Sequence, residues 1–91
     1  MAIIRIRNRP MSPELYDEAV ARTDLEHDHP LGLIMHGVCE VDGQVQVVQV
    51  WDSEEYALRF DAERLEPALA EIGAPLDSES SVCELRQLVT P

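Results

Sequence analysis

The residues best suited to proton chemistry in this chain are a histidine and a glutamine, each of which interrupts a run of aliphatic residues. The Asp42-Gly43 pair between the two runs is typical of a two-residue hairpin turn, which pairs His36 with Gln49 and Ile34 with Trp51. An imidazole among aliphatic neighbours changes protonation near neutral pH, and an amide beside it selects its tautomer. We therefore expect His36 to act as acid or base, for example on an activated carbon acid, with Gln49 orienting it. The alternative is a core histidine satisfied by one hydrogen bond.

Aromatic side chains near this pair are candidates for ligand binding. Trp51 and Tyr16 have the chemistry to stack on or hydrogen-bond a planar ligand. Tyr56 and Phe60 are one helical turn apart, a spacing that would let them wall the same cavity. Since the chain has only four aromatic residues, an ordinary core role is the alternative for each of them.

Two arginines project from one face of the first apolar segment. Arg5 and Arg7 have the charge to bind a carboxylate or phenolate of a ligand. The alternative is pairing with an acid such as Glu84 or Glu40, within the chain or across an interface with a second copy, because a buried cation needs a compensating charge.

Metal and haem chemistry have weaker signals. The residues His27-Asp28-His29 are of metal-ligating types, but they share a loop with Pro30 and have no third ligand in the pattern. His36 has the donor atom for an axial haem ligand, yet no surrounding pattern supports haem. We expect neither a metal nor a cofactor.

The elements that must position these residues form an alternating series. Isoleucines mark a first strand, and Ser12-Pro13 marks the start of a first helix. Pro67 predicts a kink near Glu66 in the second helix, and Gly73 predicts its end. The pattern predicts one α+β domain over residues 1–91, a ferredoxin-like β-α-β-β-α-β fold with an antiparallel four-stranded sheet in the order 4-1-3-2 and two helices on one face. We expect strands at 2–8, 31–41, 44–51 and 82–89, and helices at 13–26 and about 54–72.

The charge composition excludes several classes of partner. Eighteen acidic residues against seven basic ones give a formal net charge of −11, and every cation is an arginine. Such a chain would be repelled by nucleic acid and by anionic membranes. The acids at positions 14, 17, 18, 24 and 26 are interpreted as a solvated helix face. Without a membrane-length apolar run or a leader pattern at the N-terminus, a cytoplasmic location is the expectation.

Length and sheet pattern together favour self-association. A chain of 91 residues buries only about 60–65% of its unfolded surface. The predicted sheet is apolar on both faces, whereas two helices cover only one. A second copy of the chain is the expected cover for the other face, which gives a homodimer.

Several motifs resemble a known family. They are the segments 33–37 and 50–55, the Asp42-Gly43 hairpin, and the residues Phe60, Arg64-Leu65, Pro67-Ala68-Leu69 and Gly73. Together they resemble the dimeric α/β-barrel superfamily, near the antibiotic-biosynthesis monooxygenase-like proteins. The resemblance implies a ferredoxin-like fold, a barrel formed by the sheets of two subunits, and a small-molecule cavity. That superfamily includes cofactor-independent oxygenases, polyketide cyclases and haem-degrading enzymes.

Two functions are consistent with these features. The first is a small cofactor-independent enzyme, monooxygenase-like or cyclase-like, acting on an apolar or aromatic, polyketide-like metabolite between sheet and helices. The second is a non-catalytic dimeric protein that binds a small molecule or assists another enzyme. A shifted pKa and an open cavity at His36 would favour the first, and a filled core would favour the second.

Overall fold

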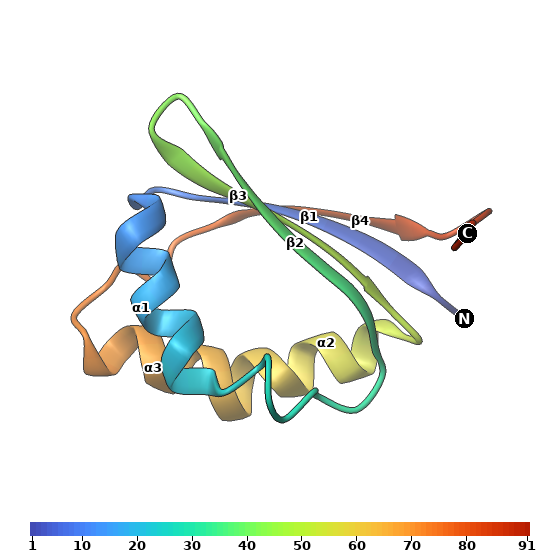
Figure 1. The fold of residues 1–91 in the computed structure, drawn as a ribbon, viewed down its shortest axis with the longest axis horizontal. Helices are drawn as coiled ribbons and strands as arrows, with labels where there is room; N and C mark the ends of the chain where they lie inside the picture. The colour runs from blue at the N-terminus through green and yellow to red at the C-terminus, as the bar shows by residue number, and fades with distance from the viewer.

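The computed structural model describes residues 1–91 and has the predicted β-α-β-β-α-β order. One antiparallel sheet has the strand order β2-β3-β1-β4, so the predicted topology is confirmed. The helices lie together on one side of this sheet (Figure 1). The elements are β1 (Ile3–Arg9), α1 (Pro13–Thr23), β2 (Leu33–Val41), β3 (Gln44–Trp51), α2 (Glu54–Phe60), η1 (Asp61–Leu65), α3 (Glu66–Glu71) and β4 (Glu79–Glu84).

Helix α1 begins as predicted but ends earlier. The Ser12 side chain accepts a hydrogen bond of 3.2 Å from the Leu15 backbone N–H, and Pro13 follows at the first helical position. The expected end near Glu26 is wrong, because Asp24 adopts a left-handed conformation with φ 56° and ends the helix at Thr23. The residues after Thr23 therefore leave the helical face.

The hairpin between β2 and β3 has the predicted register near the turn. Asp42 and Gly43 both have positive φ, as a type I′ turn requires, and His36 lies directly opposite Gln49. The expected pairing of Ile34 with Trp51 is wrong. A bulge between residues 33 and 35 places Leu33 opposite Trp51, so Ile34 has no partner across the strand pair.

The second helical region is continuous but changes its winding. A π-helical segment, η1, lies between α2 and α3 and ends two residues before Pro67. Pro67 has no N–H to donate to the preceding turn, and a wider turn accommodates the carbonyl that this leaves free. The kink predicted near Glu66 is thus a local change of winding. It places Asp61, a buried carboxylate, beneath the sheet.

Strand β4 differs most from the sequence prediction of residues 82–89. It spans Glu79–Glu84 because its partner β1 begins at Ile3, which lies opposite Glu84. The Leu85 N–H donates the last bond to the Ala2 carbonyl at 3.0 Å, and no strand continues beyond it.

The core lies between the helices and the sheet and includes Trp51, Tyr16 and Leu69. In β1, Ile3, Arg5 and Arg9 are buried toward the helices, whereas Ile6 on the opposite face is 37% exposed. We call that opposite side the outer face. It contains Ile4, Ile6, Met35, Val41 and Val48. No helix of the structure has the length and apolar character needed to span a membrane.

Candidate functional site

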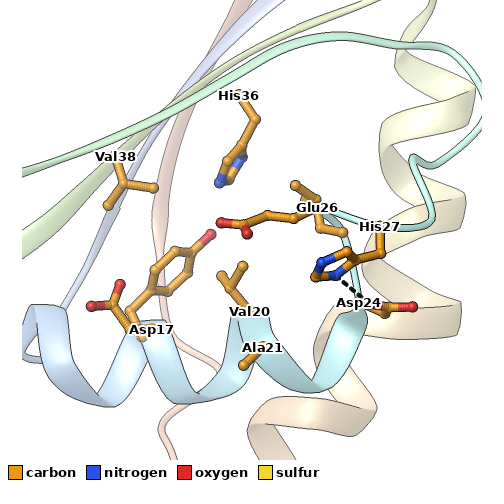
Figure 2. A pocket seen from close by; sticks show the side chains of 10 residues that line it. Asp17, Val20, Ala21, Asp24, Glu26, His27, His36 and Val38 are labelled. Carbon is orange, nitrogen blue, oxygen red and sulfur yellow. Dashed lines mark hydrogen bonds and ion pairs between the residues drawn. The ribbon is translucent and has the colours of Figure 1, made fainter.

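A cavity of about 550 Å³ separates helix α1 from strand β2. Half of its ten lining residues are hydrophobic, and the polar ones come mainly from α1 and the turn that follows it. Figure 2 shows the His36 ring pointing from β2 into this space. The lining residues are Tyr16, Asp17, Val20, Ala21, Asp24, Leu25, Glu26, His27, His36 and Val38.

The structure brings His36 and Gln49 together. Gln49 Nε2 lies 3.0 Å from His36 Nδ1. Burial lowers the pKa of His36, and the Glu26 carboxylate opposes this in part by raising the pKa. The other ring nitrogen, Nε2, is left for the cavity. The site thus contains an imidazole that favours its neutral form.

Gln49 is held from its other end by two donors. Its Oε1 accepts a hydrogen bond of 2.8 Å from Arg5 Nη2 and one of 3.0 Å from Trp51 Nε1. Gln49 is only 2% exposed, so these bonds are shielded from water. The role of Trp51 here is to hold Gln49, because its ring is fully buried and does not line the cavity.

The two arginines singled out from the sequence are paired, but with an unexpected acid. Arg5 donates two hydrogen bonds to Asp61, of 2.7 and 3.1 Å. Arg7 Nη1 lies 3.0 Å from Asp61 Oδ2, near enough for an ion pair but poorly aligned for a hydrogen bond. The prediction that Glu84 or Glu40 pairs with these arginines is wrong. Both arginines face the helices, where Asp61 of η1 provides the carboxylate. Neither arginine lines the cavity.

A third arginine, Arg9, follows on the same face of β1. It is buried, and its Nε and Nη1 atoms have no hydrogen-bond partner. Burial is the main cause that lowers its pKa, and the charge of Arg7 adds to the effect. Between the sheet and the helices, Asp61 therefore pairs with Arg5 and Arg7, while Arg9 has no carboxylate in contact.

The remaining aromatic candidates divide between cavity and core. Tyr16 lines the cavity, and burial raises its pKa to about 12, so its phenol stays neutral. Phe60 packs against Trp51 in the core with a ring-centroid distance of 5.7 Å and does not line the cavity. Tyr56 packs against Gly32 and also lies outside the cavity lining.

Three of the five acids interpreted as a solvated helix face, Asp17, Asp24 and Glu26, also line the cavity, which the sequence pattern did not indicate. Asp17 lies on α1, whereas Glu26 lies in the turn that follows the end of this helix at Thr23. Figure 2 shows its carboxylate directed across the cavity toward His36. A correct prediction of the helix end would have separated Glu26 from that solvated face.

The loop His27-Asp28-His29, considered above as a metal site, makes contacts at the surface of the protein. His27 Nδ1 lies 3.1 Å from Asp24 Oδ1, and the Asp28 carbonyl accepts a hydrogen bond of 2.6 Å from Arg64. Nowhere in the structure do three or more His, Cys, Asp or Glu side chains gather as metal ligands would.

The fold of this chain is similar to those of several solved structures. No protein-family model matches the sequence, and no curated protein is similar to it. The fold is similar to that of SnoaB from Streptomyces nogalater, a cofactor-independent oxygenase, with 18% identity and a TM-score of 0.64 over 99% of this chain and 96% of that one.

Two further structures carry the provisional description of antibiotic biosynthesis monooxygenase. The one from Nitrosomonas europaea has 6% identity and a TM-score of 0.72 over 93% of this chain and 90% of that one. The one from Caulobacter crescentus has 10% identity and the same TM-score over 94% and 91%. At these identities the likeness establishes the fold, and the resemblance drawn from the sequence is confirmed at that level.

Proposed function

We propose that this protein is a small cofactor-independent enzyme acting on a neutral, apolar or aromatic metabolite in the His36 cavity. The observation that carries the proposal is an imidazole with a lowered pKa beside an open space of about 550 Å³. An open cavity next to His36, instead of a filled core, favours an enzyme over a non-catalytic binding protein. The same fold occurs in a cofactor-independent oxygenase, so by analogy the proposed reaction class has a precedent on this architecture, while the support for it comes from the site.

The cavity lining indicates the charge of the ligand. Asp17, Asp24 and Glu26 line the space, and no arginine does. Carboxylates repel an anionic ligand, while the apolar half of the lining favours hydrocarbon surface. A neutral polyketide-like ring system with carbonyl or hydroxyl groups satisfies both conditions.

We also propose that the working form is a homodimer joined through the outer face. On that face Ile6 and Met35 are 37% and 41% exposed in the single chain, and Ile4, Val48 and Val50 adjoin them in the sheet. Contiguous exposed apolar surface of this kind is typical of an interface. The sheet of a second copy would cover it.

Anthrone, a tricyclic carbon acid, is a suitable probe of the proposed activity. Oxygenation would convert anthrone and O₂ to anthraquinone and water, and both oxygen uptake and quinone absorbance report it. We expect the wild-type protein to accelerate this reaction and His36→Asn to return the rate to background, with an unchanged circular dichroism spectrum. Equal rates for the two proteins would contradict a role for His36 in turnover.

A binding or accessory role is the second candidate. It is supported by the hydrogen bond between Gln49 and His36 Nδ1, which occupies a ring nitrogen that a base would use. Trp51, the only tryptophan, reports binding through its fluorescence because it contacts Gln49. Saturable quenching by anthrone without any turnover would favour this second role.

A further inference from the structure

The orientation of the Gln49 amide follows from its neighbours. Arg5 and Trp51 approach one end of that amide at 2.8 and 3.0 Å, and both side chains only donate hydrogen bonds. That end must therefore be the carbonyl oxygen. The reversed amide would place its NH₂ group against two buried donors and lose both hydrogen bonds.

This orientation determines the tautomer of His36. The NH₂ end of Gln49 lies 3.0 Å from His36 Nδ1, so Nδ1 must accept the hydrogen bond through its lone pair. A neutral ring then carries its hydrogen on Nε2. Protonation of Nδ1 would set N–H against N–H, so the arrangement also opposes the imidazolium form.

The arrangement is anchored outside the cavity. Arg5 Nη2 is shared between Gln49 and Asp61, and Arg5 Nη1 makes a second bond of 2.7 Å to Asp61. All three of these side chains are buried. A chain of hydrogen bonds thus runs from η1 through Arg5 and Gln49 to the cavity.

A neutral ring of this tautomer presents an N–H to the cavity and no lone pair. It is therefore suited to donate to a ligand oxygen and unsuited to remove a proton. The titratable groups that face the ring are Tyr16 and Asp17 from α1, and Asp24, Glu26, His27 and His29 from the segment after it. Asp24 contacts His27, whereas the Glu26 carboxylate points toward His36 across the cavity (Figure 2).

We propose that His36 is a fixed, neutral Nε2–H donor to a ligand carbonyl or phenolic oxygen and that Glu26 is the proton acceptor. This inference rests on the proposed function. It assigns Gln49, Arg5 and Asp61 as positioning residues. It also replaces the acid/base role expected for His36 with a donor role.

The step is a proton transfer without redox change. The Glu26 carboxylate takes a proton from a carbon that is conjugated with a ligand carbonyl, which in anthrone is the CH₂ carbon opposite the carbonyl in the central ring. The electron pair of the broken C–H bond enters the ring π system, and the carbonyl π electrons move to oxygen, which gives an enolate. That oxygen accepts the hydrogen bond from His36 Nε2–H, which strengthens as negative charge develops.

The tautomer is measurable without any ligand. In ¹⁵N-histidine-labelled protein, long-range ¹H–¹⁵N correlation spectra distinguish the two neutral tautomers, and His36→Asn assigns the signals among the three histidines. We expect His36 to be the Nε2–H tautomer at pH 7. Detection of the Nδ1–H tautomer in the wild-type protein would overturn the proposal.

A single-atom change should reverse the tautomer. Gln49→Glu keeps an oxygen toward Arg5 and Trp51 but turns a second oxygen toward His36 Nδ1. We expect Nδ1 to become protonated and the pKa of His36 to rise above that in the wild type. Gln44→Glu adds the same charge at an exposed position on the same strand and should change neither. An unchanged tautomer in Gln49→Glu would contradict control by this amide.

The role of Glu26 has its own test. Exchange of deuterium from the acidic carbon of anthrone, followed without oxygen, isolates the proton transfer from oxygenation. We expect Glu26→Gln to slow exchange by on the order of 100-fold and Glu14→Gln, at an exposed position of α1, to leave it unchanged. Equal exchange in wild type and Glu26→Gln overturns the assignment. If the wild-type protein still consumed oxygen with anthrone in that case, the proposed oxygenase function would stand and only the role of Glu26 would be wrong.

Discussion

Arg5 and Asp61 are 56 positions apart in the sequence, yet two hydrogen bonds of 2.7 and 3.1 Å join their buried side chains. The contact links the central strand β1 to the π-helical segment η1. Arg7 Nη1 lies 3.0 Å from the same carboxylate, so Asp61 compensates the charges of both arginines.

Neutralising that carboxylate should be costly. Asp61→Asn leaves the buried Arg5 and the half-buried Arg7 without a counter-charge, so we expect the free energy of unfolding to fall by about 3–5 kcal/mol. Urea denaturation followed by Trp51 fluorescence measures it. Asp77→Asn, at an exposed position, is the control and should change stability by less than about 0.5 kcal/mol. A loss below about 1 kcal/mol for Asp61→Asn would show that Asp61 is dispensable.

Stability should depend on pH through Tyr16. Burial raises its pKa from 10.0 to about 12, so the folded state keeps the phenol proton that the unfolded state loses. The stabilisation is therefore complete below pH 10 and is lost as the pH rises to about 12, roughly 3 kcal/mol for a shift of two units.

Urea midpoints between pH 9 and 12 test this dependence, and Tyr16→Phe should flatten it. In a Tyr56→Phe background Tyr16 is the only tyrosine, and its phenolate absorbance should titrate near pH 12. A midpoint near 10 would contradict the effect of burial.

Gly32 and Gly73 form a matched pair for testing a close approach. Both have positive φ, but a Cβ at Gly32 would overlap the Tyr56 ring, whereas a Cβ at Gly73 meets nothing within 4 Å. We expect Gly73→Ala to cost about 1–2 kcal/mol from backbone strain alone. Gly32→Ala should cost about 1–3 kcal/mol more because of the overlap. Equal losses in thermal or urea unfolding would mean that Tyr56 moves aside freely.

The outer face should determine the oligomeric state. Light scattering after size-exclusion chromatography should give twice the chain mass of 10.2 kDa for the wild type and the single mass for Ile6→Glu. Burying a carboxylate in an apolar interface carries a large desolvation cost. Leu58→Glu changes an exposed residue of α2, on the other side of the sheet, and should remain dimeric. A monomeric wild type would refute the proposed homodimer.

Local signals were enough to predict the strand order and the pairing of His36 with Gln49. A two-residue turn at Asp42-Gly43 determines the register for several residues, and that register holds until the bulge at Ile34. The bulge has no counterpart in the alternation of apolar residues. Register prediction therefore succeeded near the turn and failed at the far end of the hairpin.

Two site features could not be predicted because they depend on helix geometry. The helical spacing of Phe60 and Leu65 gives no sign that the winding widens between them and buries Asp61. The end of α1 at Thr23 depends on the left-handed conformation of Asp24, which composition does not reveal. Because the π-helical winding was not predicted, Asp61 was missed as the partner of Arg5. Because the end of α1 was placed too late, Glu26 was missed as a cavity residue.

Because arginines of β1 are buried, the net charge of the solvent-exposed groups is more negative than the formal net charge of the whole chain. Arg5, Arg9 and Asp61 are buried and Arg7 is half-buried between the sheet and the helices, and these four residues together account for +2 of the formal −11. The remaining four arginines and seventeen acids therefore carry −13. Two approaching copies repel each other through this acidic shell, and dissolved cations screen that repulsion. Self-association of this protein should therefore strengthen as salt is added, the opposite of an interface joined by ion pairs.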